Sequence, residues 1–163
     1  MTLAAQSESE CADVIETTHL GKVTWDSGSE LYLPSGLPGF EEERRMIPVE
    51  VPVHRPLVFL QSVRHSEVCF VSLPVLIVCP DFDLSLTEDD CAALMLDEKE
   101  TPRIGSDVLC LALLRRSGGT VETNLDAPII INLHNSRCVQ SLSPDAARGY
   151  YRLNDEGVWE RIC

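Results

Sequence analysis

The side chains best suited to moving protons or holding a cation are concentrated between Asp81 and Glu100. This stretch contains a single base, Lys99, and eight acids: Asp81, Asp83, Glu88, Asp89, Asp90, Asp97, Glu98 and Glu100. Paired carboxylates can act as general acid and base. However, three of these acids directly follow Thr87, a typical helix N-cap, and acids in a first helical turn are stabilising by ~0.3–1 kcal/mol each. Capping accounts for them, and we predict a protein that is not an enzyme.

Histidine and cysteine, the other candidate ligands and nucleophiles, are dispersed along the chain. The four histidines show no H-x-x-x-H spacing, and the seven cysteines include no C-x-x-C pair. Zinc sites usually need close pairs, and disulfide frameworks usually need even counts. Several cysteines instead lie in apolar segments, where the thiol packs as a small hydrophobe: Cys69, Cys79, Cys110 and Cys138. The chain also lacks a nucleophile elbow and a phosphate-binding loop. We therefore predict no metal and no other cofactor.

Two segments rich in glycine, proline and polar residues stand out. In Gly36–Glu41, the glycines allow unusual dihedrals, Pro38 stiffens the chain, and Phe40 is a natural anchor. Either a rigid turn pinned by a buried Phe40 or a partner-binding loop fits these residues. In 123–132, Pro128 cannot donate to a strand ladder. The residues of this second segment favour a bulge in which Asn124 satisfies loose backbone groups.

The remaining pattern is of short strands separated by turns. Candidate strands are 23–25, 31–33, 46–51, 57–63, 68–73, 82–86, 108–114, 121–125, 129–133, 138–142, 150–153 and 158–162. The first two are expected to form a hairpin through Asp26–Ser29. Residues 75–78 lie between prolines and fit either a turn of helix or an edge strand. One short helix begins after Thr87 and ends near Asp97.

These elements predict an all-β fold, mainly antiparallel, of β-barrel-like or curved sheets with one short helix. Many strands carry apolar residues on both faces, which favours a closed or highly curved sheet. Residues 1–13 are expected to be a flexible acidic tail. Residues 14–163 are expected to form one β domain that ends in a C-terminal hairpin extension.

The net charge of −13 limits the possible partners. Such a chain repels nucleic acid and attracts basic proteins, although solubility alone is an alternative reason for the charge. The apolar runs are far too short to cross a bilayer, and residues 1–13 show no secretory signal pattern. We expect a cytoplasmic protein without direct nucleic-acid or membrane binding.

An ordered set of segments resembles the bacterial flagellar assembly factor FliW family. The segments cover roughly 17–143 and comprise Gly36–Glu41, Phe59–Val63, Cys69–Val71, Pro80–Phe82 and Asn124–Asn132. The chain departs from the family pattern in Leu73–Pro80, which lacks the paired phenylalanines expected there. The residues before Val14 and the hairpin after Tyr150 look like additions.

The resemblance implies a β-barrel-like protein without catalysis that binds flagellin and the RNA-binding translational repressor CsrA. Flagellin that accumulates would occupy the factor, and the released repressor would block flagellin translation. An acidic surface docked beside the repressor's RNA face would oppose phosphate binding. Two alternatives stay open: a flagellin-dedicated chaperone without repressor contact, and a small-ligand-binding β-barrel with a deep, closed apolar pocket.

On this interpretation, the partner-binding surface is built from three parts of the chain. The predicted residues are Phe40, Glu41, Asp81, Phe82, Glu88, Asp89, Asp90, Asn124, Pro128 and Asn132. For Phe40, Asn124 and Pro128, a role in the fold itself stays open.

Overall fold

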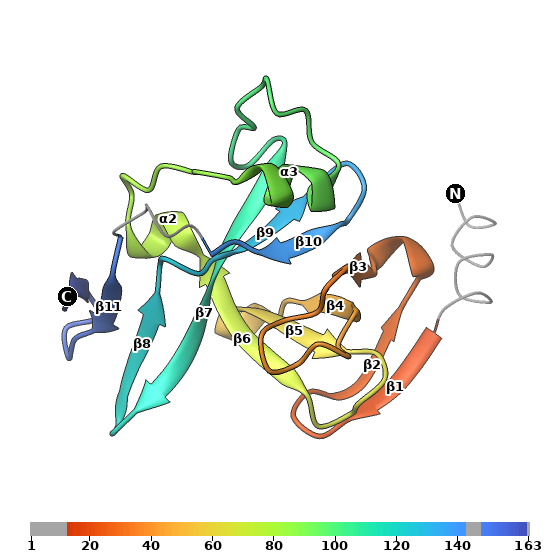
Figure 1. Ribbon diagram of the computed structural model, residues 1–163. Helices are drawn as coiled ribbons and strands as arrows, with labels where there is room; N and C mark the ends of the chain where they lie inside the picture. The colour runs from red at the N-terminus through yellow and green to blue at the C-terminus, as the bar shows by residue number, and fades with distance from the viewer. Residues whose placement is uncertain (1–12, 143–147, 163) are drawn as a thin grey trace.

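The computed structural model describes residues 13–142 and 148–162, whose strands form a ten-stranded sheet and a separate two-stranded sheet (Figure 1). The strands are β1 (Asp13–Thr17), β2 (Gly21–Trp25), β3 (Leu31–Tyr32), β4 (Arg45–Val49), β5 (Val58–Ser62), β6 (Cys69–Pro74), β7 (Val108–Ser117), β8 (Thr120–Asn124), β9 (Ile129–Asn132), β10 (Cys138–Gln140), β11 (Tyr150–Leu153) and β12 (Trp159–Arg161). All strand pairs are antiparallel. The expected mainly antiparallel all-β fold is confirmed.

The large sheet branches at its longest strand, β7. The main order is β12-β11-β8-β7-β6-β5-β4-β3, while β9 pairs with β7 and β10 with β9. The first residues of β7 pair with β9, its middle with β6, and its last four with β8. Because one strand changes neighbours along its length, the sheet curves into two connected parts. It does not close into a barrel, so of the two expected forms, closed or highly curved, the curved one is confirmed.

Strand β9 explains why an uninterrupted apolar run appears in a β protein. Successive side chains of a strand point to opposite faces. Ile129 and Ile131 lie in one core cluster with Leu60, while Ile130 lies in a second cluster with Leu94. All three isoleucines are at most 4% exposed. The molecule therefore has one core on each face of β9.

Two α-helices cover the second core, α2 (Val75–Val78) and α3 (Glu88–Leu94) (Figure 1). The helix expected after Thr87 is confirmed, with both bonds of a capping box. The Asp90 N–H donates to Thr87 Oγ1 at 3.1 Å, and the Thr87 N–H donates to Asp90 Oδ2 at 3.2 Å. Residues 75–78 take the helical alternative, so the described residues contain two α-helices rather than one. Two 3-10 helices are also present, η1 (Ser27–Ser29) and η2 (Pro52–His54).

The C-terminal end of α3 is bound to the sheet by side chains from the last residue of β9 and from the turn that follows it. Asn132 Nδ2 donates to the Leu94 carbonyl at 2.8 Å, and Asn135 Nδ2 donates to the same oxygen at 3.1 Å. Arg137 Nε donates to the Ala93 carbonyl at 2.6 Å. The last carbonyls of a helix have no partner within it, so these bonds satisfy them and fix α3 against β10.

The expected hairpin between 23–25 and 31–33 is wrong. Strand β2 pairs with β1, through a turn in which Thr17 Oγ1 donates to the Gly21 carbonyl at 2.7 Å, and β3 pairs with β4. Residues 27–29 form η1, and Glu30 is held by Arg45 of β4 at 2.8 Å. Asp13, expected in a flexible tail, begins β1. The rest of that expected tail, 1–12, lies outside the described residues.

The strand expected at 82–86 is also absent from the described structure, where this segment has no regular secondary structure. Phe82 is buried in the second core instead, and the Arg148 guanidinium lies 4.4 Å from its ring centroid. The segment thus packs against the second core without forming a strand. The C-terminal strands were correctly placed, since β11 pairs with both β12 and β8.

A buried carboxylate joins three neighbouring strands and makes stability depend on pH. Glu122 of β8 is 4% exposed and accepts hydrogen bonds from Arg152 of β11 at 2.9 Å and Arg115 of β7 at 3.2 Å. The bond from Arg152, followed by that from Arg115, lowers the pKa of Glu122 below its ordinary value of 4.5. A lowered pKa contributes stability that is complete above pH 4.5 and is lost as the pH falls through the folded-state value.

We therefore expect Glu122→Gln to be less stable than the wild type at neutral pH, with the difference shrinking below pH 4.5. Urea unfolding midpoints of both proteins, measured from pH about 7 to about 3, check this. A difference that stays constant over this range would show that the Glu122 charge does not stabilise the fold.

Candidate functional site

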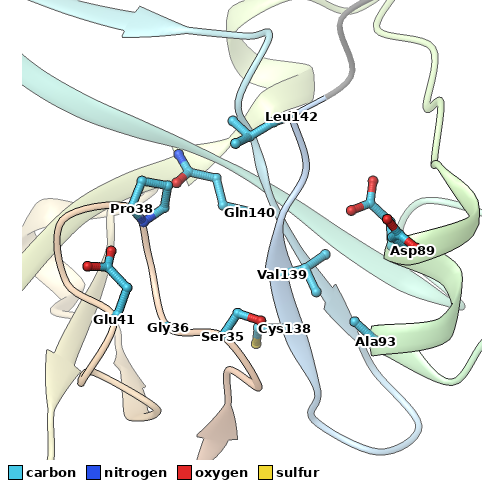
Figure 2. Close-up of a pocket in the computed structure, with 11 residues that line it drawn as sticks. Ser35, Gly36, Pro38, Glu41, Asp89, Ala93, Cys138, Val139, Gln140 and Leu142 are labelled. Carbon is cyan, nitrogen blue, oxygen red and sulfur yellow. The ribbon is translucent and has the colours of Figure 1, made fainter.

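Three segments that are distant in sequence surround a groove of about 340 Å³ that is open to solvent (Figure 2). One wall is the 35–41 loop, the other is α3, and β10 runs between them. The lining residues are Ser35, Gly36, Pro38, Glu41, Asp89, Asp90, Ala93, Cys138, Val139, Gln140 and Leu142. The groove combines the Gly36–Glu41 segment with the acidic start of α3, two of the three parts expected to form the binding surface.

The loop wall is rigid because its backbone closes on itself. Leu37 and Phe40 exchange both backbone hydrogen bonds, at 2.7 and 3.2 Å, and Gly36 has a φ of +64°. Leu37 is 2% exposed and anchors the loop in the first core. Phe40 is 43% exposed and packs edge-to-face on Phe70, with 5.0 Å between ring centroids. The turn expected to be pinned by a buried Phe40 is therefore pinned by Leu37.

Three carboxylates give the groove its negative charge. Glu41 Oε2 accepts from the Gly39 N–H at 2.5 Å, which orients it along the loop. Asp90 is held by the capping box and by Ser141 Oγ at 2.8 Å, while Asp89 is exposed on the same turn. The described residues that line the groove include no lysine, arginine or histidine. The charge of the groove thus favours a positively charged group.

The other expected site residues lie apart from this groove. Asp81 and Phe82 line a hollow of about 240 Å³ that also contains Arg148 and Arg161. Arg148 donates to the Asp83 carbonyl at 2.9 Å and closes over the buried ring of Phe82. This second hollow carries charges of both signs, unlike the groove. Glu88 is exposed in the first turn of α3 but does not line the groove.

The residues expected from the third segment do not line the groove. Asn124 Oδ1 accepts from the Asp126 N–H at 2.9 Å, so it satisfies a backbone group as expected, but in a turn rather than in a bulge. Pro128 is almost completely buried, and its carbonyl accepts from the Ser141 N–H at 2.9 Å. Asn132 is 3% exposed and holds α3. The structure thus gives these residues contacts within the fold.

Sequence reasoning missed the floor of the groove, which Val139, Gln140 and Leu142 form. Leu142 is 56% exposed, an unusual position for leucine, but exposure cannot be read from the sequence. Cys138 also lines the groove, yet burial raises the pKa of its thiol to about 12. A thiol that stays protonated at neutral pH is a poor nucleophile. The groove is therefore suited to binding rather than covalent catalysis.

A metal-binding cluster and a membrane-spanning helix are both absent from the parts of the chain that the structure describes. Residues 13–142 and 148–162 contain no cluster of three or more His, Cys, Asp or Glu side chains able to hold a metal ion. Within the same ranges, no helix has the length and apolar character needed to span a membrane. The arrangement that remains is a rigid acidic groove at the surface.

Comparison with known proteins gives a consistent result. A family model described as FliW protein matches residues 14–150. A flagellar assembly factor FliW from Pseudothermotoga lettingae is 33% identical over 142 residues, which cover 82% of this chain and 83% of that protein. One from Anoxybacillus flavithermus is 30% identical over 123 residues, covering 74% and 79%.

A solved structure also shares the fold. The crystal structure of a flagellar assembly factor FliW superposes with a TM-score of 0.73 and 22% identity, covering 91% of this chain and 96% of that one. The branched, curved sheet described above is thus the architecture of a known protein fold.

Proposed function

Because the chain belongs to the FliW family of flagellar assembly factors, we propose that it is a non-enzymatic cytoplasmic protein that binds flagellin and the translational repressor CsrA. By binding the repressor, it antagonises the repressor's RNA binding. By binding flagellin, it is withdrawn from the repressor. Flagellin translation is then coupled to flagellin secretion through one shared pool of the factor.

The single observation that carries this proposal is the acidic groove. Glu41, Asp89 and Asp90 meet on a rigid surface of a chain whose net charge is −13. RNA-binding proteins hold phosphates with basic side chains, and this contribution dominates much of their affinity. A negative surface complements such a protein and lowers the positive potential that its RNA requires.

The test separates the charge at the start of α3 from the charge of the whole protein. The double variant Glu88→Gln, Asp89→Asn removes two exposed charges from the first turn of α3 and leaves Asp90 to cap the helix. We expect inhibition of repressor–RNA binding to need several-fold more of this variant. Inhibition by the wild type should also weaken as salt is raised, because screening acts on exposed charges.

The matched control is Glu98→Gln, Glu100→Gln, which removes the same charge from exposed residues of the same acidic stretch, outside the groove. We expect this control to inhibit like the wild type. Equal inhibition by all three proteins would exclude the start of α3 from the mechanism, and equal loss in both variants would indicate total charge as the cause.

Flagellin and the repressor are titrated separately and then in competition, by calorimetry. Binding of flagellin without binding of the repressor would identify a dedicated flagellin chaperone instead. Absence of both interactions at micromolar concentration would refute the proposed function.

A further inference from the structure

The floor of the acidic groove is an edge of the sheet that no other described strand occupies along its full length. On one side, β10 pairs with β9. On its other side, Tyr32 forms one parallel bridge with Arg137, and the Tyr32 N–H donates to the Ser136 carbonyl at 2.9 Å. The chain then turns away, because the Leu33 N–H donates to the Arg44 carbonyl at 2.8 Å. Beyond Arg137, this edge of β10 therefore faces the groove.

Hydrogen-bond alternation shows which backbone groups point outward. The Asn132 N–H donates to the Arg137 carbonyl, and the Ser141 N–H donates to the Pro128 carbonyl, so residues 137 and 141 face β9. In an antiparallel pair, alternate residues face the partner strand. Val139 thus also faces β9, and Gln140 directs its N–H and carbonyl away from it. The carbonyl of Cys138 points the same way.

The two walls of the groove stand on either side of β10. Figure 2 shows β10 between the 35–41 loop and α3, with Gln140 directed toward Pro38 and Val139 toward Ala93. A strand placed along this edge would run parallel to β10, as Tyr32 of β3 does at its bridge with Arg137. Its side chains would alternate between the two walls, each of which carries a carboxylate, Glu41 or Asp89.

We propose that β10 takes up an extended basic segment of a protein partner as an added strand, with lysine or arginine side chains against Glu41 and Asp89. The inference rests on the proposed partner-binding function and specifies how one partner is held. Main-chain bonds to an exposed edge supply affinity, and side-chain sites supply specificity. The exposed Leu142 offers an apolar contact at the end of the strand.

Charge complementarity selects this occupant over the chain's own N-terminal residues. Residues 1–12 contain Glu8 and Glu10 and no lysine or arginine. Acidic walls repel such a segment, whereas they attract a basic one.

Two substitutions at one position test the added strand. Gln140→Pro removes the outward N–H and leaves the bonds to β9, which come from the flanking residues. Gln140→Val keeps that N–H and is its control, because both variants lose the Gln140 side-chain bond to the Ala127 carbonyl. The probe is a capped hexapeptide of valine with lysine at the two central positions, so that one lysine faces each wall. Its twin has glutamate in place of lysine, and both are used at concentrations on the order of 1 mM.

Binding is followed by NMR of the protein's backbone amides. We expect the lysine peptide to shift amides from Val139 to Leu142 and in the 36–41 loop, and the glutamate peptide to shift none. Gln140→Val should bind like the wild type, and Gln140→Pro about fivefold more weakly, the effect of one hydrogen bond. No shift at β10, equal binding by the two variants, or equal binding of the two peptides would overturn the inference.

A lysine peptide N-methylated on every residue keeps the test decisive if Gln140→Pro fails to fold. It has no N–H donor on either edge, so it should not bind the wild type, and equal binding would overturn the inference. The peptide experiment needs neither flagellin nor the repressor. A wild type that binds both proteins but not the lysine peptide would refute the added strand alone. A wild type that binds the lysine peptide but neither flagellin nor the repressor would refute only the proposed partners.

Discussion

Replacing Gly36 by alanine is expected to lower the free energy of unfolding by about 3 kcal/mol, because the new methyl group meets backbone atoms that cannot move independently. A Cβ at this position would lie 2.6 Å from the Phe40 carbonyl oxygen and 2.7 Å from two backbone atoms of Glu41. The same carbonyl accepts the Leu37 N–H. Relief of the clash therefore requires the loop to open, which would displace Glu41 from the groove.

The neighbouring Gly39 provides the matched control. Its φ of +83° is also in the region that disfavours alanine, but a Cβ there would have no atom within 4 Å. Gly39→Ala should cost only the backbone strain, about 1 kcal/mol. Urea unfolding of the two variants measures the difference. Equal costs would mean that the close approach of the loop backbone contributes nothing to stability.

Local sequence rules predicted some elements well, and the capped helix shows why. Thr87 and Asp90 are three residues apart, and the capping bonds they form involve only each other. The turn at 118–119 likewise connects strands that are adjacent in sequence, β7 and β8. In these cases, the signal and its physical cause lie within the same few residues.

Predictions failed where a choice of partner depended on distant residues. Strand β2 pairs with β1 rather than β3, because β3 is occupied by β4 and by the bridge to Arg137. The segment after Phe82 had a strand-like pattern, but Arg148 covers that ring from far along the chain. Alternating apolar residues predict a buried side chain equally well for a strand and for an irregular segment over a core.

In the candidate site, too, the sequence indicated the residue types but not which residues lie together. The sequence indicated Glu41 and the acids of α3 as surface charges, but not that they share a groove. Their proximity depends on β10, which packs against α3, and on the bridge from Tyr32 to Arg137. Asp81 and Phe82, although close to α3 in sequence, line another hollow. Sequence proximity therefore grouped acids that the fold separates.

Asn132 joins α3 to a strand that is distant from it in sequence. Asn132→Ala is expected to lower the free energy of unfolding by about 3 kcal/mol. Its amide donates to the Leu94 carbonyl at 2.8 Å, and its side-chain oxygen accepts from the His134 N–H at 3.0 Å. The side chain is buried, so water cannot replace both bonds after truncation. Loss of the first bond also loosens α3 from β10.

Asn135→Ala separates this burial effect from the loss of hydrogen bonds as such. Asn135 is exposed, donates to the same Leu94 carbonyl at 3.1 Å, and accepts from the Arg137 N–H at 3.0 Å. The same number of bonds is lost, but water can satisfy the groups left behind, so the cost should stay below about 1 kcal/mol. Urea unfolding compares the two variants, and amide hydrogen exchange at Cys91 and Leu94 reports on α3 itself. If Asn132→Ala were no more destabilising than Asn135→Ala, and α3 exchanged at the wild-type rate, the buried amide would not be what fixes the acidic wall of the groove.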